Sequence, residues 1–156
     1  VVSTMIGILL ITHEDMGECL IRCTTHILGV SQPQIMHINV SIQDDPKLVI
    51  DKARGLDNEL DSGDGVLVLS DIYGATPSNI ACQLIVPGKV DCMFGVNLPM
   101  LVRAITYRNE SLLKMIEKAL DGGKNGGNLI FQGLPEDLAR NKESYTAKYL
   151  AEKLVF

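Results

Sequence analysis

Two side chains in this sequence are suited to nucleophilic chemistry, and both follow the same kind of segment. His13 comes at the end of an apolar run that starts at Met5, and Asp71 directly follows the apolar run Val66–Ser70. A neutral imidazole is a nucleophile, and a carboxylate bonded to one ring nitrogen leaves the lone pair of the other nitrogen free to attack. If the electrophile is phosphorus, the site also needs hydrogen-bond donors around the transferred oxygens.

Such donors are available in the short segment that follows Asp71. Gly74, Ala75 and Thr76 are small residues, Thr76 is a favoured helix N-cap, and Pro77 suits the first position of a helix. A loop of this kind can hold an anion with its backbone N–H groups and a hydroxyl. The same residues also make any tight turn from a strand to a helix, so the loop alone leaves both interpretations open.

Other reaction classes need motifs that this sequence does not contain. It has no G-x-S-x-G, no H-E-x-x-H and no Walker-type lysine loop, which disfavours a serine hydrolase, a zincin and a nucleoside triphosphatase. Cys19 and Cys23 are four residues apart and could form half of a metal site with His13 or His26. Because no C-x-x-C pair is present, we expect the cysteines to be buried as small hydrophobic residues, and we predict no metal and no cofactor.

The elements that position these residues follow from the apolar pattern. Uncharged runs rich in β-branched residues are typical of strands buried on both faces, and apolar residues three or four apart are typical of helices. Glycine, proline and capping residues mark most boundaries. The predicted strands are 6–12, 35–40, 66–70, 90–95 and 128–132, the predicted helices are 14–28, 45–60, 76–85, 97–106 and 111–120, and a flexible glycine-rich connector is expected at 121–127 before the tail.

This alternation of strands and helices predicts an α/β fold. We expect a mostly parallel four- to five-stranded sheet with helices on both faces. The carboxyl ends of parallel strands lie at one edge of the sheet, which is where ligands bind in such folds. His13 and Asp71 therefore lie at the same edge, and they can meet if their strands are neighbours.

The composition describes an ordinary globular chain with a mild acidic excess. The chain has 156 residues, of which 46% are hydrophobic, and 14 Lys and Arg against 19 Asp and Glu give a net charge of −5. Without a basic run, nucleic acid and anionic membrane surfaces are disfavoured as partners. No apolar stretch is as long as a transmembrane helix and no signal-peptide pattern is present, so we expect a cytoplasmic protein without direct membrane insertion.

Three segments together resemble one known family. They are ILLITHEDMGECL at 8–20, VLVLSDIYGATPSN at 66–79 and FGVNLPMLVRA at 94–104. From about Met5 to Gly127, the chain resembles the mannose-type enzyme IIA components (mannose, fructose and sorbose family) of the bacterial phosphoenolpyruvate-dependent sugar phosphotransferase system. The resemblance implies a phosphotransferase that carries a phosphoryl group on a histidine.

The resemblance assigns a role to each candidate residue. His13 matches the phosphorylated histidine, which accepts phosphate from the carrier protein HPr and passes it to a IIB component of a sugar permease. Asp71 matches the acid that orients the imidazole. Gly74, Ala75 and Thr76 match the loop that lies against the phosphate.

The resemblance also implies an organisation and one departure from the family. Members commonly form homodimers, in some cases by exchanging a C-terminal strand, so we expect a IIA-like domain at 1–127 and a C-terminal strand and helical tail at 128–156 that can be exchanged as an antiparallel edge strand. Glu14 stands where the family often has glycine. An acid there would oppose an incoming dianion if it pointed inward, and it would bear on partner choice if it pointed outward.

Two alternative functions remain open at this point. One is a regulatory phosphoprotein that signals its phosphorylation state to a partner instead of feeding transport. The other is the related phosphocarrier subunit of dihydroxyacetone kinases, although the Asp-x-x-Gly-Ala-Thr-Pro and Asn-Leu-Pro-Met motifs favour the mannose type. Neighbouring genes for membrane components would favour transport.

Overall fold

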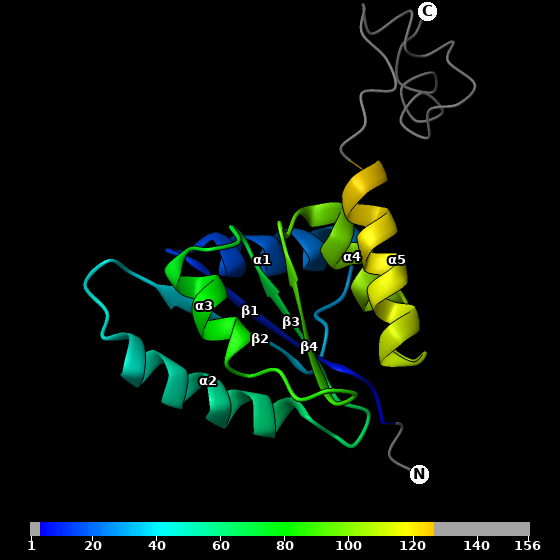
Figure 1. Cartoon of the computed structure of the whole chain (residues 1–156). Coiled ribbons are helices and arrows are strands. Elements are labelled where there is room, and N and C mark those ends of the chain that lie inside the picture. Colours follow the sequence, from blue (N-terminus) through cyan, green and yellow to red (C-terminus); the bar gives the residue numbers. More distant parts are fainter. Residues whose placement is uncertain (1–3, 127–156) are drawn as a thin grey trace, which may run out of the picture. The chain divides into compact units, whose positions relative to one another are not determined.

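A single parallel sheet forms the centre of the structure (Figure 1). The computed structural model describes residues 4–126, which contain four strands in the order β2-β1-β3-β4, every neighbouring pair being parallel. The strands are β1 (Gly7–His13), β2 (Ile35–Val40), β3 (Val66–Ser70) and β4 (Val90–Phe94). The helices are α1 (Met16–Leu28), α2 (Pro46–Leu60), α3 (Thr76–Cys82), α4 (Leu98–Thr106) and α5 (Leu112–Asn125).

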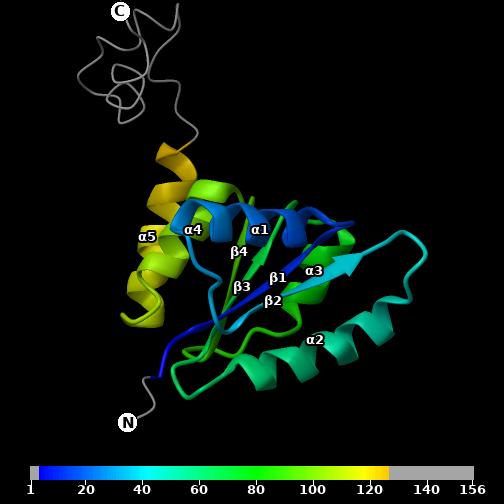
Figure 2. The same ribbon diagram turned by 180° about the vertical axis from the view of Figure 1, so that it is seen from behind.

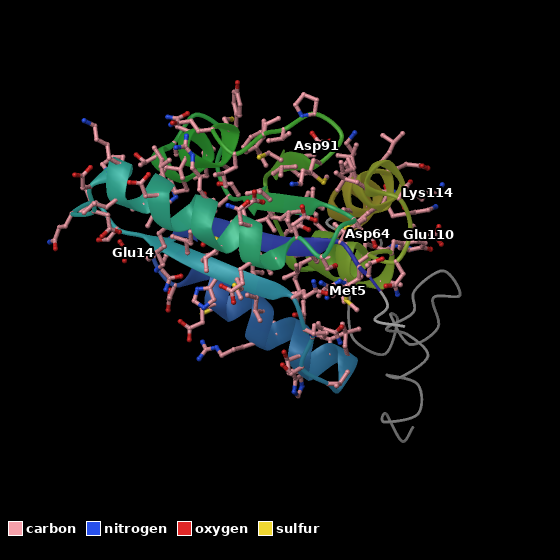
Figure 3. The ribbon with its side chains drawn as sticks, turned by 90° about the horizontal axis from the view of Figure 1, so that it is seen from below. Met5, Glu14, Asp64, Asp91, Glu110 and Lys114 are labelled. Atoms are coloured by element: carbon pink, nitrogen blue, oxygen red, sulfur yellow. The ribbon has the colours of Figure 1, made fainter. Side chains whose placement is uncertain are left out.

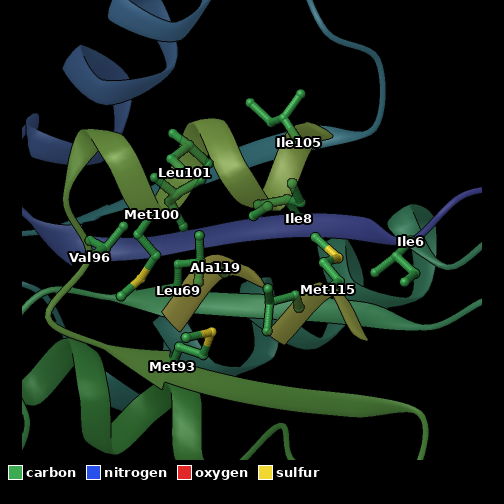
Figure 4. Packing of buried hydrophobic residues seen from close by; sticks show 13 residues of the cluster. Ile6, Ile8, Leu69, Met93, Val96, Met100, Leu101, Ile105, Met115 and Ala119 are labelled. Atoms are coloured by element: carbon green, nitrogen blue, oxygen red, sulfur yellow. The ribbon is translucent and has the colours of Figure 1, made fainter. Parts of the chain in front are cut away.

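Helices cover both faces of this sheet, with α1, α4 and α5 on one face and α2 and α3 on the other (Figures 1 and 2). The side chains of β1 alternate between two cores. Ile8 and Leu10 join the core under α4 and α5, which Figure 4 shows in close-up, whereas Leu9 and Ile11 join the core under α2 and α3. All four are fully buried. A strand buried on both faces tolerates no charge, which is why this segment reads as a continuous apolar run.

The predicted α/β fold with a parallel sheet and helices on both faces is therefore confirmed. β1 lies between β2 and β3, and its register with β3 pairs Ile11 with Ser70. The strands that end at His13 and Ser70 are thus direct neighbours that end at the same edge. The predicted strand at 128–132 and the tail beyond it lie outside the described residues, and no antiparallel edge strand is shown.

The start of α1 differs from the prediction. Glu14 has a backbone φ of 45° and so cannot belong to a right-handed helix. Its N–H instead donates to the carbonyl of Val40, 3.1 Å away, at the end of β2. The helix begins two residues later, at Met16.

The predicted connector at 121–127 is wrong over most of its length, because α5 continues to Asn125. The glycines there serve close packing of α5 against α4. A Cβ at Gly123 would lie 2.7 Å from Cε of Met100, and one at Gly122 would overlap the side chain of Arg103. Asn97, the N-cap residue of α4, also donates from Nδ2 to the carbonyl of Gly123 at 3.0 Å.

Arg108 holds together the edge of the sheet where the strands begin. Its side chain lies in a site that is 3% exposed, and it donates to the carbonyls of Ile6 (3.0 and 3.2 Å), Pro33 (2.6 Å) and Gln34 (2.9 Å). Burial lowers the pKa of Arg108 to about 10. The guanidinium group thereby ties the loop after α4 to the start of β1 and to the connection that leads into β2.

Candidate functional site

His13 and Asp71 meet at the opposite edge, where β1 and β3 end. His13 is the last residue of β1, and Asp71 directly follows β3. Nδ1 of the His13 ring lies 2.8 Å from Oδ2 of Asp71, and the backbone N–H of His13 donates to the same oxygen at 2.9 Å. The Asp71 side chain is 7% exposed and that of His13 is 46% exposed. The imidazole is therefore fixed from its protected side and open on the other.

The Asp71 carboxylate is itself held by backbone groups. Its Oδ1 accepts from the N–H of Ile72 at 2.8 Å, and its carbonyl accepts from the N–H of Gly95 at 2.7 Å. Burial by itself raises the pKa of Asp71, but the hydrogen bonds from the backbone and ring of His13 and from Ile72 outweigh burial and hold that pKa below its ordinary value. An ionised carboxylate accepts only, so we assign the proton to Nδ1 of His13, which leaves the lone pair on Nε2.

A cleft of about 420 Å³ opens beside His13. The predicted loop residues Gly74, Ala75 and Thr76 line this cleft together with His13. None of the described residues that line it is Lys or Arg, so its polar groups are hydroxyls, an amide, backbone groups, the imidazole and one carboxylate. The full lining is His13, Glu14, Val40, Ser41, Ile42, Gly74, Ala75, Thr76 and Asn79.

The loop before α3 begins the helix differently from the prediction. Ala75, not Thr76, is the N-cap residue, and Thr76 is the first residue of α3. Gly74 adopts a φ of 87°, a conformation that suits glycine. Thr76 therefore presents its N–H group from the first turn of α3, where helical N–H groups have no partner within the helix.

Four cleft residues were not singled out from the sequence, and the first of them, Val40, is the last residue of β2. Ser41 and Ile42 follow β2 at the same edge of the sheet, and Asn79 lies in the first turn of α3. Ser41 and Ile42 had a readable signal, because they stand at the end of a predicted parallel strand. Nothing in the local sequence distinguishes Asn79.

The alternative metal site is not formed. Within residues 4–126 no group of three or more His, Cys, Asp or Glu side chains could hold a metal ion. Cys19, Cys23 and His26 line a separate hollow of about 560 Å³, whose lining also includes Leu98 at the start of α4. The expectation that the cysteines are buried is wrong, because Cys23 and Cys82 are exposed and Cys19 and Cys92 are partly exposed.

Comparison with known proteins identifies the family of this chain. A family model described as the fructose IIA component of the phosphotransferase system matches residues 7–120. The chain belongs to this family. It is 29% identical over 124 residues to the mannose-specific EIIAB component of the phosphotransferase system from Escherichia coli, a match that covers 78% of this chain but only 38% of that relative.

Solved structures of IIA proteins share the fold. The phosphotransferase component EIIA of Streptococcus agalactiae has a TM-score of 0.72 and 23% identity, and covers 80% of this chain and 97% of its own. The IIA protein associated with the fucose utilization operon of Streptococcus pneumoniae has a TM-score of 0.73 and 21% identity, over 83% and 96% of the two chains. Among residues 4–126, no helix combines the length and the apolar character needed to cross a membrane.

Proposed function

We propose that this IIA protein carries a phosphoryl group on Nε2 of His13, taking it from phospho-HPr and passing it to a IIB component of a sugar permease. The observation that carries the proposal is the 2.8 Å contact between Nδ1 of His13 and Asp71 beside an open cleft. This contact occupies one ring nitrogen and leaves the other as the nucleophile. Membership of the IIA family supports a carrier role in the sugar phosphotransferase system.

The transfer step uses the two ring nitrogens for different tasks. The lone pair of Nε2 attacks phosphorus, so that an N–P bond forms on His13 while the N–P bond of the donor phosphohistidine breaks. The breaking bond leaves its electron pair on the donor ring, and a donor ring protonated on its other nitrogen leaves as neutral imidazole. The proton on Nδ1 of His13 stays in place, and Asp71 stabilises the positive charge of the phosphorylated ring.

We assign the phosphoryl oxygens to the loop that lines the cleft. Gly74 and Thr76 offer backbone N–H groups, Thr76 and Ser41 offer hydroxyls, and Ala75 completes this part of the lining. The N–H of Ala75 itself donates to the carbonyl of Ile72 at 3.3 Å. These neutral donors suit a group that must be bound and then released, because a cationic side chain would hold it more tightly. Residue types and placement support this role for the loop.

Cellular location and oligomeric state follow from the same carrier role. We propose that it acts in the cytoplasm, where both HPr and a IIB component are accessible, and that it functions as a homodimer in which the tail at 128–156 takes part. Size-exclusion chromatography with light scattering on the full chain and on a chain ending at Gly127 tests the second statement. A dimer that persists unchanged without the tail would contradict it.

Phosphorylation of the purified protein tests the carrier function directly. The protein is incubated with labelled phosphoenolpyruvate, enzyme I and HPr, alongside His13→Ala and His37→Ala variants. His37 is a matched control, since it lies on β2 and its Nδ1 contacts Oδ1 of Asn39 at 3.0 Å. We expect acid-labile label on the native and His37→Ala proteins and none on His13→Ala. Native-level label on His13→Ala would contradict the proposal.

A further inference from the structure

We infer that Glu14 weakens the hold of His13 on its phosphoryl group and so tunes this carrier toward donating rather than storing phosphate. The inference rests on the proposed function and concerns a residue to which neither that function nor the fold assigns a task. Glu14 directly follows the nucleophile and lines the same cleft.

The backbone conformation at Glu14 is the first observation. Its φ of 45° lies in the left-handed region, which disfavours residues with a Cβ, and the conformation is held by the bond from its N–H to the carbonyl of Val40. Among the described residues, no hydrogen bond or ion pair to the Glu14 carboxylate offsets this strain. A strained acid without a structural partner beside a reactive group is a candidate for a functional role.

The charge of the cleft is the second observation. Asp71 already supplies one negative charge, and Glu14 adds a second from the wall of the cleft, at the end of the molecule opposite Met5 and Asp64 (Figure 3). No described lining residue is Lys or Arg. Within the described lining, no cationic side chain therefore compensates the charge of Glu14.

The chemical consequence follows from the charge of the transferred group. A phosphoryl group brings about two negative charges at neutral pH, and Glu14 directly follows His13 in the chain and lines the same cleft. Repulsion raises the free energy of the phosphorylated state more than that of the free state. The phosphorylated protein becomes a stronger donor, and the free protein becomes a poorer acceptor.

The equilibrium of transfer between HPr and this protein measures the effect. Native protein, Glu14→Gln and Asp15→Asn are brought to equilibrium with HPr, enzyme I and labelled phosphoenolpyruvate at low salt, and the label on each carrier is counted. Asp15→Asn is the matched control, because it removes the same charge one residue away from a side chain that does not line the cleft. Circular dichroism verifies that each variant is folded.

We expect Glu14→Gln to shift the partition toward this protein by about threefold to tenfold, and Asp15→Asn to shift it by less than about twofold. Raising the salt concentration to about 1 M, where the Debye length is about 3 Å, should remove most of the difference. An unchanged partition in Glu14→Gln, or an equal shift in Asp15→Asn, would overturn the inference.

A chemical donor separates this inference from the carrier function. Phosphoramidate transfers its phosphoryl group to a histidine nitrogen, and ammonia leaves with the electron pair of the broken P–N bond. If HPr fails to label native protein but phosphoramidate labels His13, the carrier proposal fails. The inference about Glu14 is then tested by comparing the rates at which phosphoramidate labels native protein and Glu14→Gln. Glu14→Gln should then react about three times faster than native protein, since the anionic reagent is no longer repelled. Equal rates, or no label on His13 from either donor, would overturn it.

Discussion

The basic side chains at the two ends of the strands have opposite environments. Where the strands begin, Arg108 is almost fully buried and all its described partners are backbone carbonyls. Where the strands end, His13 is half exposed and has a single described side-chain partner, Asp71. The guanidinium group of Arg108 is thus surrounded by carbonyl acceptors, whereas only one ring nitrogen of His13 contacts Asp71.

The same contrast holds for the two strained residues. Besides Glu14, Gln34 is the other described non-glycine residue with a positive φ, at 51°. The side chain of Gln34 donates to the carbonyl of Leu60 at 3.1 Å, and its own carbonyl accepts from Arg108. The side chain of Gln34 is thus anchored by a hydrogen bond, whereas Glu14 is bonded through its backbone N–H and its side chain lines the cleft beside His13. The residues that stabilise the sheet and those of the candidate site thus lie at opposite ends of the same strands.

Removing the acid that orients the ring should have the largest effect. Asp71→Asn keeps the shape of the side chain but no longer holds the proton on Nδ1, so the rate of phosphorylation should fall by about two to four orders of magnitude. Rapid-quench labelling from phospho-HPr measures this rate. Asp45→Asn, an exposed acid that caps α2 near the same edge, should keep the native rate. A native rate in Asp71→Asn would show that the pair is not functional.

Removing the hydrogen bonds of Arg108 should lower the stability of the protein and leave the phosphorylation of His13 unchanged. Arg108→Met leaves the carbonyls of Ile6, Pro33 and Gln34 without this donor, which we expect to cost about 3 kcal/mol of unfolding free energy, or about 10 °C in Tm. Urea unfolding and calorimetry measure the loss. Arg54→Met removes an exposed arginine of α2 and should cost less than about 0.5 kcal/mol. Equal losses in the two variants would contradict the role of Arg108.

Replacing each of the two positive-φ residues by glycine should change the stability of the protein differently. Glu14→Gly should stabilise the protein by about 1 kcal/mol, because glycine adopts a left-handed φ without a steric penalty. Gln34→Gly removes a similar strain but loses the bond to Leu60, so we expect no net gain. Thermal unfolding of the two variants provides the test. A larger gain from Gln34→Gly than from Glu14→Gly would reverse the comparison.

The smallest expected effect is on the pH dependence of stability, to which the ionisation of Asp71 contributes. Because its pKa is lowered in the folded protein, the stabilisation is present above the ordinary pKa of about 3.9 and is lost as the pH falls through the lowered value. The unfolding free energy of native protein should therefore fall more steeply in this acidic range than that of Asp71→Asn. Parallel pH profiles for the two proteins would contradict the lowered pKa.

The sheet and the contact between His13 and Asp71 could be predicted from the sequence because their signals are local. β1 and β3 are buried on both faces, so they had to be uninterrupted apolar runs, and the residue that ends each run stands at the carboxyl edge. The sequence also predicted Asn97 as a helix cap and left Asp44 and Asp45 as alternatives for the cap of α2, which the structure assigns to Asp45. Both cap side chains accept from N–H groups two or three residues away. Parallel topology then required His13 and Asp71 to share an edge.

The incorrect predictions concern residues whose neighbours are distant in sequence. Gly122 and Gly123 look like a flexible connector until α4 is packed against them, and then their lack of a Cβ is what permits the contact. Cys23 falls on the outer side of α1, so its apolar character gave no reliable indication of burial. A neighbouring element, α4, decided the environment of the two glycines, whereas Cys23 is exposed because no described element covers its face of α1.

By itself, the sequence determined the family and the order of the described elements, and it predicted His13 and Asp71 as a candidate nucleophile and its acid, because each depends on residue type and short-range spacing. Only the tertiary structure decided that β1 and β3 are neighbours, that Nδ1 and not Nε2 of His13 faces Asp71, and that Glu14 turns into the left-handed region beside the cleft. These depend on strand order and on hydrogen bonds such as that between Glu14 and Val40, which join residues far apart in the chain. Folding brings such residues together, and residue type alone does not specify which partners meet.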